Sequence, residues 1–240
     1  MSPKTIIVTG ANRGIGLGLI QQFVKDQSIR CLIATARDVE KATELNGIKD
    51  PRLHVLQLET TSDSSIDNFV KKVDELVGSE GLNLLINNAG VLLPYTDISR
   101  DLITEQLSVN TTSTVILTQK LLPLLKRASG SGAAAWIINI SSLLGSIGLN
   151  DFGSSTHNVL AYRMSKAALN QFTKTLSIDL KSDNISVVSF CPGWVKTDLG
   201  GQEAFFTVEQ STKDLVESFG KLNEEHNGGF YSKTLEKHEW

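Results

Sequence analysis

The chain has 240 residues and carries 23 Lys and Arg against 26 Asp and Glu, for a formal net charge of −3. With 40% hydrophobic and 20% charged residues, its composition is that of a globular protein and excludes a disordered chain. The lack of a basic excess argues against nucleic acid as the main partner, and no apolar run approaches the roughly 20 residues of a membrane helix.

Short apolar segments alternate with helix-length segments along the chain. The continuous apolarity of the short segments is typical of parallel strands that are covered on both faces. We expect strands at residues 5–9, 31–36, 53–58, 84–87, 133–140, 185–190 and 229–232. We expect helices at residues 15–25, 64–77, 100–127, 158–181 and 207–222. Asp63 is suited to cap the second of these helices, and Pro123 is expected to kink or split the third.

Strand followed by helix, repeated about six times, predicts an α/β fold built on a doubly wound parallel sheet of the Rossmann type. No linker, low-complexity tract or internal repeat interrupts the pattern, so residues 1–240 are expected to form a single domain. Right-handed crossovers between the strands place the ligand crevice at their carboxyl ends.

The two cysteines, Cys31 and Cys191, each lie inside an apolar run. This position is typical of buried free thiols in a reducing compartment. Residues 1–5 lead directly into a strand pattern rather than a signal peptide, which predicts a cytoplasmic protein that makes no membrane contact. No paired Cys and His spacing indicates a metal site.

Glycines cluster where the first expected strand meets the first helix, in the segment TGANRGIG at residues 9–16. Glycines at this turn let the backbone approach a pyrophosphate, and the helix N-terminus supplies free N–H groups to the phosphates. Tight turns need glycine in any case, but the place of this cluster favours a nucleotide site over a purely structural turn.

The end of the second expected strand, Ala36-Arg37-Asp38, bears on which nucleotide binds. An acidic residue there would hold the ribose 2′-hydroxyl of NAD, whereas an arginine would pair with the 2′-phosphate of NADP. Arg37 and, in the glycine loop, Arg13 occupy the two places where a 2′-phosphate would lie, which favours NADP. Asp38 stays ambiguous because it is also suited to cap the next helix, and the alternative for Arg37 is a solvated surface residue.

Tyr162 and Lys166 lie four positions apart in helical sequence, so their side chains share one face. A free phenol has a pKa of about 10, and a nearby ammonium group lowers that pKa because it stabilises the phenolate. Such a tyrosine can donate a proton to an alkoxide, or accept one in the reverse reaction. Tyr–Lys pairs at this spacing are also common on surface helices, so the pair alone does not define a catalytic site.

Five motifs taken together resemble the short-chain dehydrogenase/reductase family over nearly the whole chain. They are TGANRGIG at 9–16, NNAG at 87–90, NISS at 139–142, the pair Tyr162 and Lys166, and PGWVKT at 192–197. Residues 161–170 and 192–201 are most similar to the carbonyl-reductase-like branch that includes sniffer and the C-factor proteins.

The resemblance implies roles for individual residues. Tyr162 matches the tyrosine that transfers a proton, and Lys166 matches the lysine that also binds the nicotinamide ribose. Ser142 matches the serine that hydrogen-bonds the substrate carbonyl. Asn110 matches the helix asparagine that supports a water relay to the lysine, although outside the family context it would be an ordinary polar helix residue. Besides Tyr162 and Lys166, the implied cofactor-binding residues are Gly10, Asn12, Arg13, Gly14, Ile15, Gly16, Arg37, Glu59, Asn88, Ala89, Gly90, Pro192, Gly193, Val195 and Thr197.

Three features depart from the family pattern. Ser142 and Tyr162 are 20 positions apart, more than in many members, and the glycine-rich segment 144–158 between them must loop out near the site. We expect this loop to shape the pocket through Phe152, with a subunit contact or a plain surface loop as the alternatives. Glu59 stands where the family usually has Asp for the adenine amino group, and the short region after Thr197 predicts an open pocket.

We therefore expect the protein to reduce the carbonyl group of a ketone, aldehyde or quinone to an alcohol. NADPH would supply the hydride, and Tyr162 would supply the proton. Two alternatives stay open: an NAD-linked alcohol dehydrogenase of the same fold, and a nucleotide-binding signalling or sensor protein in which catalysis is incidental. A homo-oligomer could form through the two long helices at 100–127 and 158–181. Candidate residues for an apolar substrate pocket are Leu92, Leu93, Pro94, Tyr95, Leu143, Leu144, Phe152, Trp194, Phe205 and Phe206.

Overall fold

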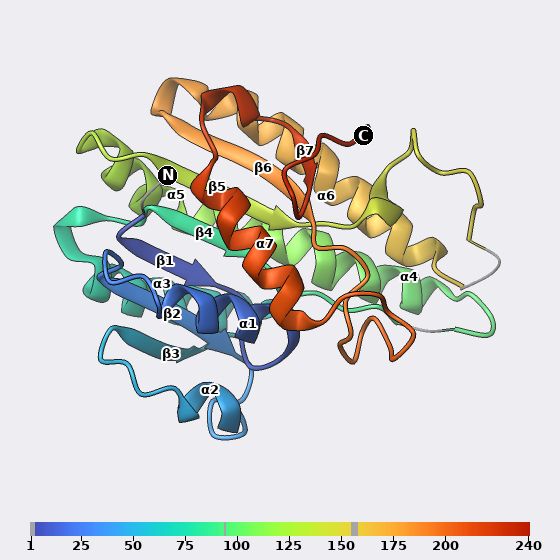
Figure 1. The fold of residues 1–240 in the computed structure, drawn as a ribbon, viewed down its shortest axis with the longest axis horizontal. Helices are drawn as coiled ribbons and strands as arrows, with labels where there is room; N and C mark the ends of the chain where they lie inside the picture. The colour runs from blue at the N-terminus through green and yellow to red at the C-terminus, as the bar shows by residue number, and fades with distance from the viewer. Residues whose placement is uncertain (1–2, 94, 155–157) are drawn as a thin grey trace.

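Seven parallel strands form one sheet at the centre of the protein (Figure 1). The structure is a computed structural model that describes residues 3–93, 95–154 and 158–240. The strand order is β3-β2-β1-β4-β5-β6-β7, so the direction of winding reverses between β1 and β4, and the predicted doubly wound sheet is confirmed. The strands are β1 Thr5–Val8, β2 Cys31–Ala36, β3 Leu53–Gln57, β4 Leu84–Asn87, β5 Ala135–Ile140, β6 Ile185–Cys191 and β7 Phe230–Ser232.

Helices cover both faces of this sheet. The main ones are α1 Gly14–Phe23, α2 Thr43–Gly47, α3 Asp63–Val77, α4 Arg100–Leu107, α5 Ser113–Gly130, α6 Leu160–Asp179 and α7 Val208–Gly220. In Figure 1, α1 and α7 lie in front of the sheet, and α3, α5 and α6 lie behind it. Residues of β1 alternate between the layers, since Ile6 and Val8 pack with α1 and α7 while Ile7 packs with α3, α5 and α6. Within the described ranges, no helix has the length and apolar content needed to cross a bilayer.

The expected helix at 100–127 is interrupted, but not at Pro123. Helix α4 ends at Leu107, and the π-helix Ser108–Thr112 separates it from α5, which continues through Pro123. Pro123 is exposed, so the carbonyl group that it leaves without an intrahelical partner can reach water. The break therefore lies at the π-helix, where the extra residue in the turn changes the direction of the following side chains.

Neither aspartate that is suited to cap a helix is an N-cap in the structure, so the expectation for Asp63 is wrong. The N-cap of α3 is Ser62, whose Oγ accepts a hydrogen bond from the Ser65 amide at 3.3 Å. Asp63 is instead the first helical residue, where its carboxylate still interacts favourably with the helix dipole. Asp38 does not cap α2; its Oδ1 accepts a hydrogen bond from the Lys41 amide at 3.2 Å, in the turn before that helix.

Arg52, in the turn that leads into β3, ties the end of α1 to the sheet. Its guanidinium donates to the carbonyl oxygens of Val24 at 2.7 Å, Asp26 at 2.6 Å and Ile29 at 2.9 Å. It also forms an ion pair with Asp50 at 2.7 Å, and both side chains are largely buried. One cation thus satisfies carbonyl groups at and beyond the helix C-terminus, where intrahelical donors run out.

We expect Arg52→Met to lower the free energy of unfolding by about 2 kcal/mol, because it leaves the carbonyls and the Asp50 carboxylate without their donor. Arg30→Met is the matched control, since the ion pair of Arg30 with Glu80 is half exposed and such pairs contribute roughly 1 kcal/mol or less. Urea denaturation of both variants measures the difference. Equal losses would show that the Arg52 contacts stabilise no more than an exposed ion pair.

Candidate active site

A large cavity opens at the carboxyl ends of the strands, where a doubly wound sheet binds its ligand. Its volume is about 1620 Å³, above the roughly 300–1,000 Å³ of a pocket for one small ligand, so it has room for a dinucleotide and a second molecule. The lining comes from the glycine loop, from the segments that follow β2, β4, β5 and β6, and from the start of α6. All the site residues that the sequence predicts line this cavity except Gly16 and Asn110.

The glycine loop is shaped for the close approach of a backbone or a phosphate. Gly10 and Gly14 have φ angles of +62° and +56°, a conformation that favours glycine. A side chain on Gly16 would place its Cβ 2.4 Å from the Gly10 carbonyl oxygen, so this residue supports the loop from within the fold. Helix α1 begins without a side-chain cap and without an acidic residue in its first turn, which leaves its first N–H groups to an anion. The loop therefore fits the phosphates of a dinucleotide.

The segment after β4 is held directly against this loop. Asn88 Nδ2 donates to the carbonyl oxygens of Thr9 at 2.8 Å and Gly10 at 3.1 Å. In return, Thr9 Oγ1 accepts the amides of Asn88 at 2.9 Å and Ala89 at 3.0 Å. These bonds fix the spacing of two walls of the cavity. Asn87 points elsewhere and bonds Asn139 across the sheet at 2.8 Å.

Both arginines expected at a 2′-phosphate line the cavity and are exposed. Arg37 directly follows β2, while Arg13 forms an ion pair with Asp198, in the segment after Thr197. A phosphate would compete with Asp198 for Arg13, because a guanidinium forms charge-assisted hydrogen bonds with either group. The sequence prediction missed Asp198; its place directly after a residue matched to the cofactor site was the available signal.

Ser142, Tyr162 and Lys166 meet in the cavity from two elements. Ser142 follows β5, whereas Tyr162 and Lys166 lie on one face of α6 and are only 8% and 4% exposed. Lys166 Nζ donates to the Ile140 carbonyl oxygen at 2.9 Å and lies 5.7 Å from the centre of the Tyr162 ring. Ser142 Oγ accepts the amide of Leu144 at 3.1 Å. The three side chains that the family resemblance selects are thus neighbours.

Burial controls the ionisation of both helix residues. It raises the pKa of Tyr162 well above its usual range, and the hydrogen bond with Ser142 offsets this only in part. Burial also lowers the pKa of Lys166 to about 8. The expectation that the ammonium depresses the pKa of Tyr162 is therefore wrong here, because desolvation of the phenolate dominates. Tyr162 is a protonated phenol at neutral pH, the form that a proton donor requires.

Two of the predicted site residues bond mainly to the protein itself. Asn110 is buried on the π-helix, where its amide bonds the N–H and the carbonyl of Val91, each at 2.8 Å, and Ser165 Oγ at 3.0 Å. It therefore stands beside the cavity and fixes the backbone that follows Gly90. Glu59 lines the cavity, but its carboxylate accepts the amide and the hydroxyl of Thr61 at 3.2 Å and 2.9 Å.

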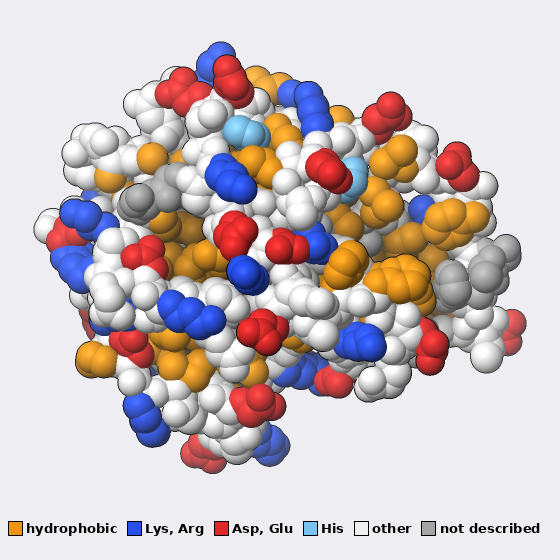
Figure 2. Space-filling view, viewed as in Figure 1, with side chains coloured by type: hydrophobic (Ala, Val, Ile, Leu, Met, Phe, Trp, Pro, Cys, Tyr) orange, Lys and Arg blue, Asp and Glu red, His pale blue; other side chains and the backbone are white. Residues whose placement is uncertain are grey.

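The candidate pocket residues divide into two groups. Those that line the cavity are Leu92, Leu143, Leu144, Phe152, Trp194 and Phe205. Leu93, Tyr95 and Phe206 do not line it, and Pro94 lies outside the described residues. Cys191, buried as expected, also borders the cavity. Figure 2 shows apolar side chains exposed on the side of the molecule where the loop after β5 lies.

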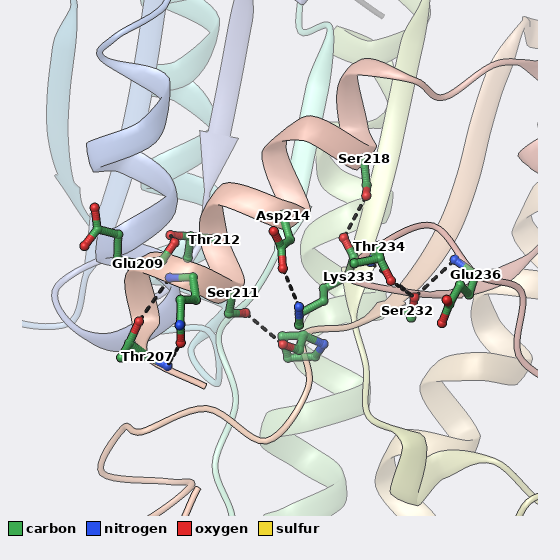
Figure 3. A network of polar contacts seen from close by, with 12 residues as sticks. Thr207, Glu209, Ser211, Thr212, Asp214, Ser218, Ser232, Lys233, Thr234 and Glu236 are labelled. Atoms are coloured by element: carbon green, nitrogen blue, oxygen red, sulfur yellow. Dashed lines mark hydrogen bonds and ion pairs between the residues drawn. The ribbon is translucent and has the colours of Figure 1, made fainter. Parts of the chain in front are cut away.

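The wall after β6 is held by α7 and by the turn after β7 (Figure 3). Ser211 Oγ donates to the Pro192 carbonyl oxygen at 2.8 Å. Lys233 forms an ion pair with Asp214, and its ammonium lies 4.3 Å from the centre of the Phe206 ring. Phe206 in turn packs so close to Gly193 that an added Cβ would lie 2.9 Å from its ring. This part of the cavity is therefore fixed by the packing of the chain.

Comparisons with known proteins agree with this geometry. A sequence model of the short chain dehydrogenase family matches residues 4–204, and the chain belongs to this family. The chain is 59% identical to the proposed carbonyl reductase Sniffer of Caenorhabditis elegans, over 100% of both chains, with a TM-score of 0.93. The NADPH-bound carbonyl reductase from chicken fatty liver is 36% identical over 100% of both chains, with a TM-score of 0.95. C-signal of Myxococcus xanthus is 33% identical over 158 residues, which cover 62% of this chain and 87% of that protein.

The lowered pKa of Lys166 predicts how stability changes at alkaline pH. Between pH 8 and its ordinary value of 10.5, the unfolded chain binds more protons at this residue than the folded protein, so the free energy of unfolding rises with pH. From about pH 7 to about pH 9.5, we expect the wild type to gain roughly 2 kcal/mol relative to Lys166→Met, which does not titrate at this position. Urea denaturation at both pH values measures this gain. If the difference in the free energy of unfolding between the wild type and Lys166→Met is the same at both pH values, the pKa of Lys166 is at its ordinary value.

Proposed function

We propose that residues 1–240 act as one dinucleotide-binding oxidoreductase domain that uses NADPH to reduce a carbonyl group, in a ketone, aldehyde or quinone, to an alcohol. The observation that carries the proposal is the meeting of Ser142, Tyr162 and Lys166 in the same cavity as the glycine loop. The likeness to carbonyl reductases, one of them with NADPH bound, supports it.

NADP(H) is the cofactor that the charges around the cavity favour. The glycine loop and the first N–H groups of α1 would hold its phosphates, and Arg37 and Arg13 would pair with the 2′-phosphate. The 2′-hydroxyl of NAD calls for a carboxylate at the end of β2, but the carboxylate of Asp38 is paired with Lys41 at 3.0 Å. Binding of NADPH would draw Arg13 away from Asp198, so the cation would exchange one anion for another.

The residues of the chain act on the carbonyl oxygen of the substrate. When bound, NADPH supplies the hydride that the carbonyl carbon accepts. Ser142 donates a hydrogen bond to the oxygen, and Tyr162 gives it the phenolic proton as negative charge develops there. The Lys166 ammonium, which is mostly charged below pH 8, stabilises the same negative charge, and its burial strengthens this effect. One hydride at carbon and one proton at oxygen complete the alcohol.

Two other functions compete with this proposal. An NAD-linked alcohol dehydrogenase would use the same three residues and differ only at the adenosine ribose, so the affinities for NADH and NADPH separate the two. The likeness to C-signal favours a signalling protein with incidental catalysis as the second candidate. Such a protein would keep its function without the Tyr162 hydroxyl, whereas a reductase would not.

The expected substrate is an apolar carbonyl compound, because Leu92, Phe152, Trp194 and Phe205 line the cavity that also holds Ser142, Tyr162 and Lys166. Pairing of two copies through the segments 100–127, which holds α4 and most of α5, and 158–181, which holds α6, stays a prediction, as does a cytoplasmic location. Gel filtration with light scattering tests the first, and cell fractionation tests the second.

We expect Arg37→Ala to weaken the binding of NADPH by roughly 10- to 100-fold and to leave the binding of NADH nearly unchanged, since only NADPH has a 2′-phosphate to lose its partner. Lys49→Ala is the matched control, because it removes an exposed cation that also lies between β2 and β3 but is outside the cavity lining. Fluorescence titration gives the dissociation constants. An equal loss for both cofactors would contradict the assignment of Arg37 to the 2′-phosphate.

We expect Tyr162→Phe to reduce carbonyl turnover by about 10²- to 10⁴-fold while the affinity for NADPH stays within a factor of a few, because the ring remains and the acid is lost. NADPH oxidation, followed by absorbance with a panel of ketones, aldehydes and quinones, measures the effect. If the variant kept more than about a tenth of wild-type activity, Tyr162 would not be the proton donor.

A further inference from the structure

Arg163, the residue next to Tyr162 on α6, is a buried cation that the proposed reaction does not use. The residue is 7% exposed, and burial lowers the pKa of its guanidinium. Its Nη1 donates to the Leu144 carbonyl oxygen at 3.1 Å, and its guanidinium carbon lies 4.7 Å from the centre of the Phe152 ring. Among the residues described, its Nε and Nη2 have no hydrogen-bond partner.

This arrangement is costly for the folded protein. A buried charge is usually paired with an opposite charge, and a buried N–H group without a partner destabilises the fold by about 1–3 kcal/mol. Arg163 has neither a carboxylate partner within the described ranges nor a full set of hydrogen bonds. Its contacts therefore call for a role other than stability, and both of them reach the loop between Ser142 and Tyr162.

The first contact leads to the Ser142 hydroxyl. The amide of Leu144 donates to Ser142 Oγ at 3.1 Å, and the carbonyl of the same residue accepts from Arg163. One residue thus links the guanidinium to the hydroxyl that is proposed to bond the substrate oxygen. The turn that Ser142 begins is packed tightly on α6, since a Cβ on Gly145 would lie 2.7 Å from the backbone carbon of Lys166. A shift of Leu144 would therefore change the orientation of Ser142 Oγ.

The second contact leads to the wall of the cavity. Phe152 lines the cavity, yet its side chain is on a loop and is 55% exposed. A guanidinium over an aromatic face stabilises the ring position by roughly 0.5–2 kcal/mol, depending on burial. The guanidinium of Arg163 lies against this ring, so it helps to fix the position of the cavity wall.

We propose that Arg163 is a positioning residue, which orients the Ser142 hydroxyl through Leu144 and places the substrate wall through Phe152. The two branches predict separable effects. Loss of the bond to Leu144 lowers the rate of the chemical step for every carbonyl substrate. Loss of the ring contact raises the Michaelis constant of bulky substrates more than that of small ones. This proposal rests on the proposed function, because it assigns Ser142 to the substrate oxygen.

The experiment compares Arg163→Met, which removes both contacts, with Phe152→Leu, which removes only the aromatic face. Met164→Ala is the matched control, since the next residue on α6 is exposed and absent from the cavity lining. At saturating NADPH, kcat and KM are measured for a small and a bulky carbonyl. The dissociation constant for NADPH and the amide hydrogen exchange of residues 143–152 are measured in parallel.

For Arg163→Met we expect kcat to fall on the order of tenfold with both substrates, because one hydrogen bond no longer fixes Ser142. We expect KM to rise severalfold more for the bulky substrate than for the small one. Amide hydrogen exchange at residues 143–152 should accelerate, and the dissociation constant for NADPH should stay within about twofold of the wild-type value. Phe152→Leu should reproduce the change in KM without the change in kcat. Arg163→Lys, which keeps a charged donor, should recover part of kcat.

Several results would overturn the proposal. If Arg163→Met accelerates exchange and leaves kcat and KM unchanged, Arg163 only ties down a loop. If kcat, KM and NADPH affinity fall together, the residue supports the fold in general. If Arg163→Met fails to fold, the proposal is tested with Arg163→Lys and Phe152→Leu instead. Wild-type values of kcat and KM in both variants would refute it. If the wild type reduces no carbonyl compound, the proposed function is wrong, whatever the role of Arg163. Unchanged amide hydrogen exchange in Arg163→Lys and Phe152→Leu would refute the link from Arg163 to the loop.

Discussion

The hydrogen bond from the buried Lys166 ammonium to the Ile140 carbonyl joins the helix that carries Tyr162 to the strand that leads into Ser142. It is 2.9 Å long, and Lys166 is only 4% exposed although it lines the cavity. Because both groups are largely buried, separation of α6 from β5 would leave the donor and the acceptor poorly satisfied. The relative position of the three reactive side chains follows from this constraint.

Packing around α6 reinforces the same geometry from the other side. The π-helix before α5 turns Asn110 toward α6, where its amide bonds Ser165 Oγ at 3.0 Å. Thr111, from the same turn, donates to the Ser165 carbonyl oxygen at 2.8 Å. On the strand side, Ser141 Oγ bonds Asn170 at 2.6 Å. The first half of α6 is therefore held by polar contacts with both neighbours, while its second half packs through apolar residues such as Leu176.

Sequence reasoning predicted the structure correctly where one local physical cause determines the conformation of a segment. Most of the strands are buried on both faces and largely apolar, so the strand ranges were predicted to within two residues. The glycine loop followed from the place of its glycines. The break at Ser108–Thr112 was missed because a π-turn has no strong local signature, whereas Pro123 has one and is tolerated at the surface. The pairing of Arg13 with Asp198 joins residues 185 positions apart, which no local pattern reports.

The direction of the Tyr162 pKa shows a second limit of sequence reasoning. Spacing along a helix indicates that Lys166 is near, but it does not say how much water the phenol loses or which group the ammonium bonds. Here desolvation raises the pKa of Tyr162 and the ammonium bonds the end of β5. In the proposed reduction, this shift keeps Tyr162 protonated at neutral pH, so that its proton is available when negative charge develops on the substrate oxygen.

Two buried cations on α6 hold the two carbonyl groups that flank Ser142. Lys166 bonds the carbonyl of Ile140, two residues before Ser142, and Arg163 bonds that of Leu144, two residues after it. Neither cation has a carboxylate partner among the residues that the structure describes. Each is stabilised by a backbone carbonyl group, and Arg163 also by the face of the Phe152 ring. An uncompensated positive field in a poorly solvated site favours negative charge on a bound oxygen. In the proposed reduction, the same two bonds would fix the position of Ser142 and favour the negative charge that develops on the substrate oxygen.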